Sequence, residues 1–439
     1  MKNATRKRRR GSLYASVLVI SLMVAMIGIA SLQIANVTLR QSTDIGSLPS
    51  AQILARSAIE FAVLQLRSDP NWRTTYSNNT SYPTSGRISL GNGSFTYRFV
   101  DVDGNLSDDD ADAVRVWGIA NVGEATWAES VLMLPTGSGI SSLQASICSE
   151  GSLTTSSSAC VESNQRVAAG SSISVSSTQS LLAAKYIEAG STITGNAAGL
   201  TSTSATARKM PSDTVFDYYL ARGTYIDVSG LPTVSGARRM GEVALGPGVN
   251  PYGVANPEGV YIIDCKNQKV TISDSRIVGT LILLEPGIDS SISDQISLAP
   301  AISNYPSLLV RGNLKFSYQS DAFLSESSEA INFNPSGAPD NGVTDADTSD
   351  RYPSLIRGLI YISGTLDAPS DSQTSVNEGT LLAGSITFSS SHRTKYSPLY
   401  SASPPPGFAR GNPMVIAPGT WRREIAPTGS AFGGEATGP

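Results

Sequence analysis

Histidine and cysteine are scarce in this 439-residue chain, which contains one histidine, His392, and three cysteines, Cys148, Cys160 and Cys265. These residues form neither a CxxC pair nor a Cys/His cluster, which nearly excludes a zinc site of the usual kind. If the body lies outside the cytoplasm, Cys148 and Cys160 could form a disulfide and leave Cys265 free. Three unpaired thiols are the alternative.

Sequence motifs of catalysis are missing as well. Any Ser/His/Asp triad would have to use His392, yet no GxSxG nucleophile elbow occurs in the chain. The phosphate-binding GxGxxG and P-loop motifs are also absent. We therefore expect that the protein is not an enzyme and has no organic cofactor.

Charged residues make up only 15% of the chain, and the net charge is −4. The basic residues are unevenly placed, because six of them lie between Lys2 and Arg10. No other stretch interleaves basic and aromatic residues. This asymmetry suits a membrane-orientation signal better than a nucleic-acid-binding patch, so we expect no nucleic-acid partner.

A long uncharged segment, residues 11–39, follows the basic cluster. A helix over this span is long enough to cross a hydrocarbon core about 30 Å thick. By the positive-inside rule the basic end stays in the cytoplasm, which predicts a single-pass inner-membrane protein whose body is periplasmic or on the cell surface. A cleavable signal peptide is the alternative, because Gly28-Ile29-Ala30 offers a small-x-small cleavage site.

Helical periodicity resumes after a break that we expect near Gly46 and Pro49. One face of segment 51–72 is apolar and carries Ala55, Ile59, Ala62 and Leu66. The other face carries Arg56 and Glu60, which stand four residues apart and could form an ion pair. The anchor is therefore expected to continue into an amphipathic helix.

The N-terminal region resembles type IV pilin-like proteins, specifically the minor pilins and the minor pseudopilins of type II secretion. The resemblance rests on the basic leader KNATRKRRRG, the apolar helix that follows Gly11, and the amphipathic continuation that ends in RSDPNWR. It implies that a prepilin peptidase cuts between Gly11 and Ser12, that the new N-terminus is methylated, and that the retained helix packs against other subunits. Most family members have a glutamate where this chain has Ser16. Minor pseudopilins that cap filament tips also lack this glutamate, so the resemblance implies a tip or initiator role.

The expected fold class is α+β to mainly β. Alternating apolar and polar residues at 93–105 and 113–134 predict antiparallel strands that pack on the helix as a pilin-like head. Short Ser/Gly-rich β segments then recur and predict a β-helix, or solenoid, with a β-sandwich as the alternative. A Pro/Gly-rich end predicts an extended or disordered tail. The expected domains are a leader (1–11), the helix (12–70), the head (71–136), the β-helix (138–400) and the tail (403–439).

The turn between the two strand segments is crowded with oxygen-bearing side chains: Asp101, Asp103, Asn105, Asp108, Asp109, Asp110 and Asp112. A hard cation relieves such crowding, so we predict a calcium site with Asp101, Asp103, Asn105, Asp109 and Asp112 as ligands. A solvated hairpin loop is the alternative. A second acidic loop, residues 339–350, allows the same two interpretations.

These sequence features are compatible with two functions from different classes. The first is a membrane-anchored, pilin-like structural subunit, a minor or tip component of a type IV pilus or type II secretion filament. Its partners would be a prepilin peptidase, other pilin-like subunits and the inner membrane. The second is a membrane-anchored β-helix protein that binds or cleaves polysaccharide. Only the first function requires processing at Gly11.

Overall fold

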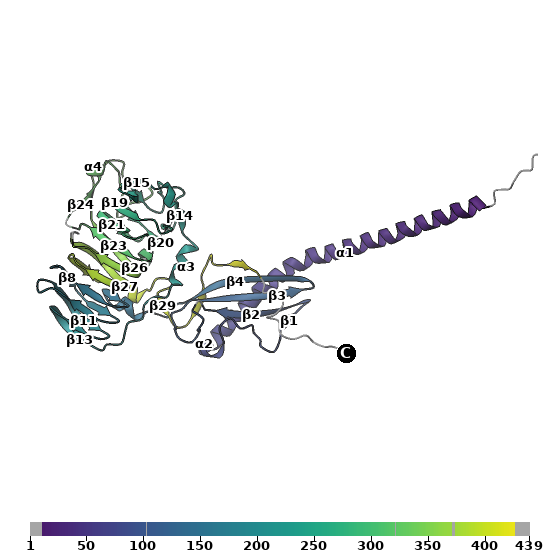
Figure 1. Cartoon of the computed structure of the whole chain (residues 1–439), viewed down its shortest axis with the longest axis horizontal. Coiled ribbons are helices and arrows are strands. Elements are labelled where there is room, and N and C mark those ends of the chain that lie inside the picture. The colour runs from purple at the N-terminus through teal and green to yellow at the C-terminus, as the bar shows by residue number, and fades with distance from the viewer. Residues whose placement is uncertain (1–10, 102, 321, 371–373, 426–439) are drawn as a thin grey trace, which may run out of the picture.

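The computed structural model describes residues 11–101, 103–320, 322–370 and 374–425. Three parts follow one another in space: the long helix α1 (Gly11–Ser68), a small antiparallel head, and a large parallel β-solenoid (Figure 1). The predicted fold class, an N-terminal apolar helix followed by a mainly β body, is confirmed. Residues 1–10 of the predicted leader and residues 426–439 of the predicted tail lie outside the described residues.

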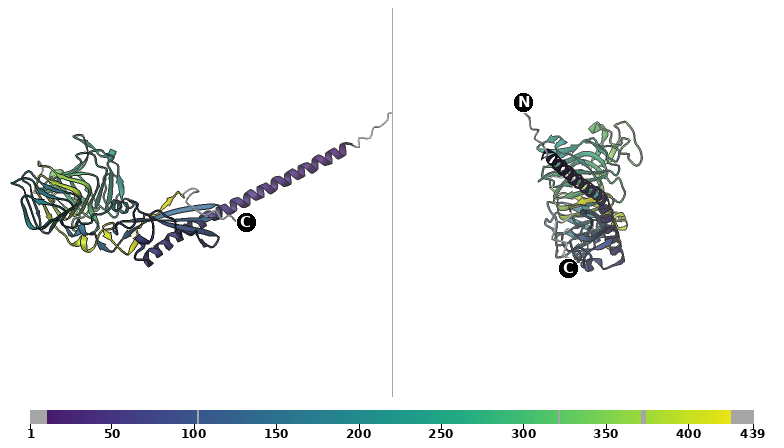
Figure 2. Two further views of the ribbon diagram at one scale, coloured as in Figure 1. Left: turned by 60° about the horizontal axis from the view of Figure 1, so that its bottom comes forward. Right: turned by 90° about the vertical axis from the view of Figure 1, so that its right-hand side faces the viewer.

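Helix α1 is continuous over 58 residues, so the break expected near Gly46 and Pro49 is wrong. Pro49 lies inside this helix, where a proline keeps a helical φ but removes one backbone N–H and crowds the preceding turn, so it weakens the helix at this point without ending it. The N-terminal half of α1 projects away from the rest of the molecule, whereas its C-terminal end lies against the head (Figure 2).

The head is a six-stranded antiparallel sheet covered by the C-terminal part of α1. Its strands are β1 (Ile88–Leu90), β2 (Gly93–Val100), β3 (Val114–Val122), β4 (Ala125–Pro135), β30 (Met414–Ile416) and β31 (Arg422–Glu424). A short helix, α2 (Trp72–Thr75), follows α1. The apolar face expected from the sequence is buried here, since Ile59, Ala62 and Leu66 pack with Phe99 and Val116.

Two of the head strands come from the segment that the sequence predicts to be an extended or disordered tail. Strands β30 and β31 both pair antiparallel with β4, and they place Met414 opposite Pro135 and Arg423 opposite Glu129. Strands of only three residues cannot be recognised in a sequence segment that is so rich in proline and glycine. These strands need little periodicity of their own because β4 offers a preformed edge. The described part of the segment therefore completes the head.

The solenoid is an insertion between β4 and β30. The chain leaves the head through β5 (Ser138–Gly139) and returns through β29 (Ala409–Arg410), and these two strands pair antiparallel. The entry and exit of the insertion therefore lie side by side, next to the edge of the head sheet.

Two separate runs of chain build the solenoid, and each rung has three sides. The first run contains β6 (Ile147–Ser149), β7 (Leu153–Thr155), β8 (Cys160–Ser163), β9 (Arg166–Ala169), β10 (Ile173–Val175), β11 (Leu181–Ala189), β12 (Ile193–Thr194) and β13 (Ala197–Ser202). The second run contains β14 (Thr224–Ile226), β15 (Thr233–Val234), β16 (Ala237–Gly241), β17 (Ala244–Leu245), β18 (Val260–Asp264), β19 (Val270–Val278), β20 (Thr280–Leu284), β21 (Ser291–Ala299), β22 (Pro306–Arg311), β23 (Leu314–Tyr318), β26 (Leu355–Ala368), β27 (Ser375–Phe388) and β28 (His392–Lys395).

The end of the second run stacks on the beginning of the first. Strand β27 pairs in parallel with β6 and β7, and β28 pairs in parallel with β8. We call this junction the seam. The two runs thus form one sheet, which confirms the predicted solenoid rather than a sandwich, although the rungs do not follow chain order.

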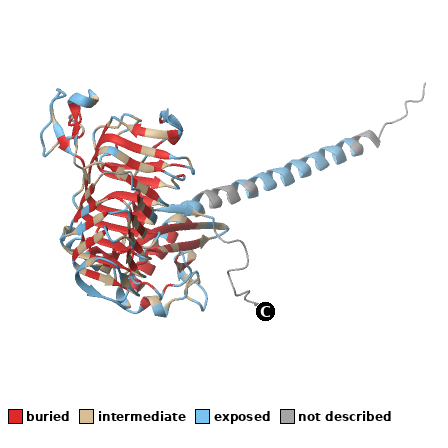
Figure 3. Ribbon diagram, turned by 60° about the vertical axis from the view of Figure 1, so that its left-hand side comes forward, coloured by how far each residue is buried: buried red, intermediate tan, exposed pale blue. Residues whose placement is uncertain are grey.

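Short elements connect these parts. They are the helices α3 (Val215–Leu220), α4 (Glu326–Glu329) and α5 (Leu399–Ala402), the 3₁₀ turns η1 (Ser141–Gln144) and η2 (Val228–Gly230), and the paired strands β24 (Phe323–Ser325) and β25 (Arg351–Pro353). Helix α3 packs through Phe216 and Tyr219 into an apolar cluster that also holds Leu132 of the head and Leu382 of the solenoid. A second apolar cluster fills the solenoid interior. Figure 3 shows that long stretches of the solenoid strands are buried. The head and the solenoid are therefore joined through a buried apolar interface.

Candidate functional site

The predicted processing site lies at the very start of α1. Gly11 is the first residue of this helix and Ser12 is the second. The cut between them stays a prediction, because the rest of the leader lies outside the described residues.

The apolar half of α1 fits a single membrane crossing. Residues Ser16–Asn36 have a mean hydropathy of 2.4, and none of this span is buried against the rest of the chain. A signal sequence would meet the same criteria of length and composition. The side chains of Ser16–Asn36 are therefore available to a membrane or to the helices of other subunits.

A buried carboxylate fixes the other half of α1 to the head. Arg56 does not pair with Glu60 as expected, but with Glu129 of β4, at 2.9 Å between Nε and Oε2. Glu129 is buried, and it also accepts hydrogen bonds from Gln52 Nε2 at 3.2 Å and Trp127 Nε1 at 2.9 Å. Three donors from two elements thus converge on one side chain and fix the helix on the sheet.

The acidic turn of the head brings together only part of the predicted calcium ligands. Asp101, Asp103 and Asp112 each offer a carboxylate oxygen within 4.8 Å of the others. The Asn105 side chain is engaged within the loop instead, since its Oδ1 accepts a hydrogen bond from the Ser107 hydroxyl at 2.9 Å. Asp109 is likewise engaged elsewhere, in an ion pair with Lys209.

A basic side chain lies beside these three carboxylates. Arg73 of α2 donates to the carbonyl oxygens of Leu106 and Asp112, at 3.2 and 2.6 Å, and its Nη1 lies 3.8 Å from Asp101 Oδ2. Burial, followed by the nearby charge of Asp109, raises the pKa of Asp112 to about 6. The turn therefore carries its own counter-charge, and calcium binding there stays a prediction.

Of the two alternatives for the cysteines, the structure has the unpaired one: Cys148, Cys160 and Cys265 are free thiols, and the possible Cys148–Cys160 disulfide is absent. Cys148 on β6 is buried in the apolar cluster between solenoid and head, whereas Cys160 begins β8, with its Sγ 3.7 Å from Glu162 Oε1. Strands β6 and β8 form different sides of one rung, with β7 between them, so their side chains leave the rung in different directions. Burial raises the pKa of Cys148 to about 12.

His392 lies inside the solenoid. Its Nδ1 is 2.6 Å from the Ser375 hydroxyl, its Nε2 is 2.8 Å from Asn377 Oδ1, and its ring stacks on Phe388 with 4.7 Å between centroids. These contacts, from a hydroxyl to an imidazole to an amide, resemble the contacts within a hydrolytic triad. However, His392, Ser375 and Asn377 are all at most 1% exposed, so a substrate has no access to the hydroxyl.

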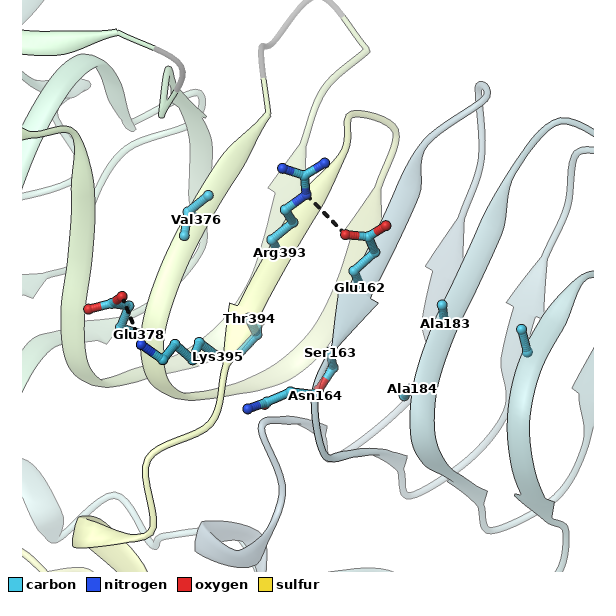
Figure 4. A pocket seen from close by; sticks show the side chains of 11 residues that line it. Glu162, Ser163, Asn164, Ala183, Ala184, Val376, Glu378, Arg393, Thr394 and Lys395 are labelled. Carbon is cyan, nitrogen blue, oxygen red and sulfur yellow. Dashed lines mark ion pairs between the residues drawn. The ribbon is translucent and has the colours of Figure 1, made fainter.

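An open groove crosses the seam on the outer surface of the solenoid (Figure 4). Its volume is about 610 Å³. The groove is lined by charged residues of β27, β28 and β8 and by the small side chains of Ala183, Ala184 and Ala198. Arg393 of β28 pairs with Glu162 of β8 across the seam, at 3.0 Å. A neighbouring hollow of about 330 Å³ shares Glu378 and Lys395 with it.

The charges of the groove and of the neighbouring hollow follow the strand register. Arg357, Glu378 and Lys395 stand on successive rungs, and Glu378 pairs with both cations, at 3.1 Å to Arg357 Nε and 3.6 Å to Lys395 Nζ. Sequence reasoning missed this groove because its residues come from distant segments. Only a rung-by-rung alignment that included the seam could have found it.

Comparisons with known proteins assign no family to the chain. No protein-family model matches it, and neither does any curated protein. Among solved structures it is similar to the competence-associated pilin ComZ from Thermus thermophilus, with 10% identity and a TM-score of 0.27, over 86% of this chain and 98% of that chain.

Proposed function

We propose that the protein is a membrane-anchored, pilin-like structural subunit of a filament. The observation that carries this proposal is the division of α1 into two halves. One face of the C-terminal part is buried on the head, and the apolar span Ser16–Asn36 is uncovered. An uncovered apolar helix of this length requires a membrane or the apolar helices of other subunits around it.

The same geometry supports a position at the filament tip. The solenoid lies beyond the head, on the side away from the projecting half of α1 (Figure 1). In a filament of parallel subunits, the space beyond one head is occupied by the next subunit toward the tip. A body that fills this space is best accommodated where no further subunit follows. Ser16, which replaces the usual glutamate of shaft subunits, agrees with this proposal.

Processing at Gly11 is the experiment that tests the proposal. The full chain would be expressed with a prepilin peptidase, and the mature N-terminus determined by intact mass. We expect a chain that begins at Ser12, and we expect Gly11→Ala to block maturation but not membrane insertion. Gly28→Ala is the matched control, because a Cβ at Gly28 meets no atom within 4 Å.

Two other results would contradict the proposal. A mature chain that begins at Ser31 would indicate export by signal peptidase. An intact chain that begins at Met1 in the presence of active peptidase would indicate a plain membrane anchor.

The groove at the seam favours a second function, the binding of polysaccharide by the solenoid. Arginine and glutamate side chains held side by side offer donors and acceptors to neighbouring sugar hydroxyls. The test is calorimetry of the full chain in detergent with neutral and acidic polysaccharides, beside an Arg393→Ala/Lys395→Ala variant. Binding that this variant retains would reject the groove as the site.

A further inference from the structure

The solenoid has two different ends, one near β15 and the other at β13 (Figure 1). At the first end, segment 227–236 folds over the first rung. Val228 and Leu231 of this segment are buried in the solenoid interior, and β15 pairs antiparallel with β16. Arg238 of β16 fixes the segment, since its Nη1 donates to the carbonyl oxygens of Ser229 and Leu231, at 3.2 and 3.0 Å. We call this the closed end, because the chain itself covers the interior there.

The opposite end finishes with a rung that has a strand on each of its three sides. Strand β12 forms one side and pairs with β10, and β13 forms the other two and pairs with β11, with a shift of register at Gly199 between them. Among the described residues, no strand pairing continues beyond this rung. Thr194, Leu200 and Thr201 are exposed on it. We call this the open end, because its outer backbone N–H and C=O groups form a free sheet edge.

The open end has none of the features that usually protect a strand edge. Natural proteins protect an exposed edge with charged side chains, with prolines or with a covering segment. Residues 189–207 contain no charged residue and no proline. The nearest charges on either side, Glu188 and Arg208, pair with each other at 2.8 Å. An edge of this kind is suited to pairing with the backbone of another strand.

The outline of the last rung indicates which partner fits it. A single strand from another protein covers one straight side, whereas the open end of a second copy presents the same three-sided outline. Neither copy brings a charge to this contact, so the two ends do not repel each other. The seam shows that solenoid rungs from separate runs of this chain stack through their edges, because β27 and β28 pair with β6, β7 and β8.

We propose that two copies of the protein associate through their open ends, with β13 of one copy antiparallel to β13 of the other. A contact of this kind uses the same surface on both copies. It stops at two copies, because segment 227–236 covers the far end of each solenoid. The rungs stack across the direction in which α1 projects, so the second copy leaves α1 free (Figure 3). The proposal does not depend on the filament function.

Sedimentation of the full chain in detergent, over a range of protein concentrations, tests the proposal. We expect a reversible equilibrium between monomer and dimer. Thr194→Lys/Leu200→Lys places one lysine on β12 and one on β13 and should raise the dissociation constant about tenfold or more, because like charges then meet across the contact. Val234→Lys/Val254→Lys is the matched control, since it adds the same charge at two exposed positions that flank the strands of the closed end.

Cross-linking separates this contact from an association of α1 helices within one micelle. Leu200→Cys in a Cys160→Ser background gives β13 an accessible thiol, because the other two cysteines are buried. A bis-maleimide should then join two copies. Val254→Cys in the same background is the control and should remain monomeric after treatment. Circular dichroism would verify that each variant folds.

Three outcomes would overturn the proposal. The first is a monomer up to the highest concentration at which the protein stays in solution. The second is a dimer that Thr194→Lys/Leu200→Lys leaves unchanged in a folded protein, which would assign the association to α1. The third is a dimer that the control Val234→Lys/Val254→Lys also weakens, which would indicate that an open end stacks on a closed end.

Discussion

Arg56 of α1 and Glu129 of β4 form an ion pair in which one partner is exposed and the other is buried. The Arg56 side chain is 56% exposed and that of Glu129 is 7% exposed. The carboxylate therefore depends on its protein donors, whereas the guanidinium is largely hydrated. This asymmetry predicts which of the two residues matters more for the attachment of the helix to the head.

Glu129→Ala should destabilise the head by about 1–3 kcal/mol, because it leaves the indole N–H of Trp127 and the amide of Gln52 without their acceptor. Arg56→Ala should cost less, about 1 kcal/mol, because Gln52 and Trp127 still donate to the buried carboxylate and the guanidinium that is lost is largely hydrated. Urea denaturation of the full chain in detergent would measure both values. Equal losses for the two variants would contradict this ranking.

A glycine sets the closest approach between α1 and the sheet. A Cβ at Gly118 of β3 would collide with the backbone carbonyl oxygen of Ala55. Gly118→Ala should therefore lower the melting temperature of the head, because helix and strand must separate to admit the methyl group. Gly46→Ala is the control, since a Cβ there meets no atom within 4 Å and alanine favours a helix. A fully stable Gly118→Ala variant would show that the packing is looser than described.

The fold class could be predicted from the sequence, because the signals that define it are local. Residues 93–100 alternate in a strand that does form, and the apolar face of α1 at Ile59 and Ala62 is indeed buried. The glycine-rich β segments likewise indicate rungs that stack. Each of these patterns is formed by residues close together in the chain, so it can be recognised from the sequence alone.

What the sequence could not predict depends on contacts between distant segments. The pairing of β30 with β4 and of β28 with β8 joins residues more than two hundred positions apart. The acidic turn illustrates the same limit, because Lys209 neutralises Asp109 from far along the chain. The spacing of Cys148 and Cys160 allows a disulfide, but spacing does not show that β7 separates the strands that carry them.

Thiol labelling should distinguish the free cysteines from a disulfide. Cys160 is partly exposed, whereas Cys148 and Cys265 are buried, and burial raises the pKa of each of these two thiols to about 12. Without reductant, the native protein should react with one maleimide and the unfolded protein with three. A Cys148–Cys160 disulfide would instead give no label in the native state and one in the unfolded state.

His392 should make the stability of the solenoid depend on pH. Complete burial lowers its pKa to about 3, whereas the unfolded chain has the ordinary histidine pKa of about 6.5. Between these two values the unfolded state binds a proton that the folded state does not bind. Stability is therefore full above pH 6.5 and falls as the pH decreases, by about 1.4 kcal/mol per pH unit.

The comparison of wild type with His392→Leu isolates this effect, because His392 is the only histidine and the carboxyl groups are common to both proteins. From pH 7 to pH 5 the free energy of unfolding of the wild type should fall by about 2 kcal/mol more than that of the variant. Urea denaturation at the two pH values gives both differences. The variant loses the contacts to Ser375 and Asn377, so it should be less stable at pH 7, yet its smaller pH slope does not depend on this loss. Equal slopes for the two proteins would mean that the imidazole is accessible to protons in the folded state, and the buried position of His392 at the seam would then be wrong.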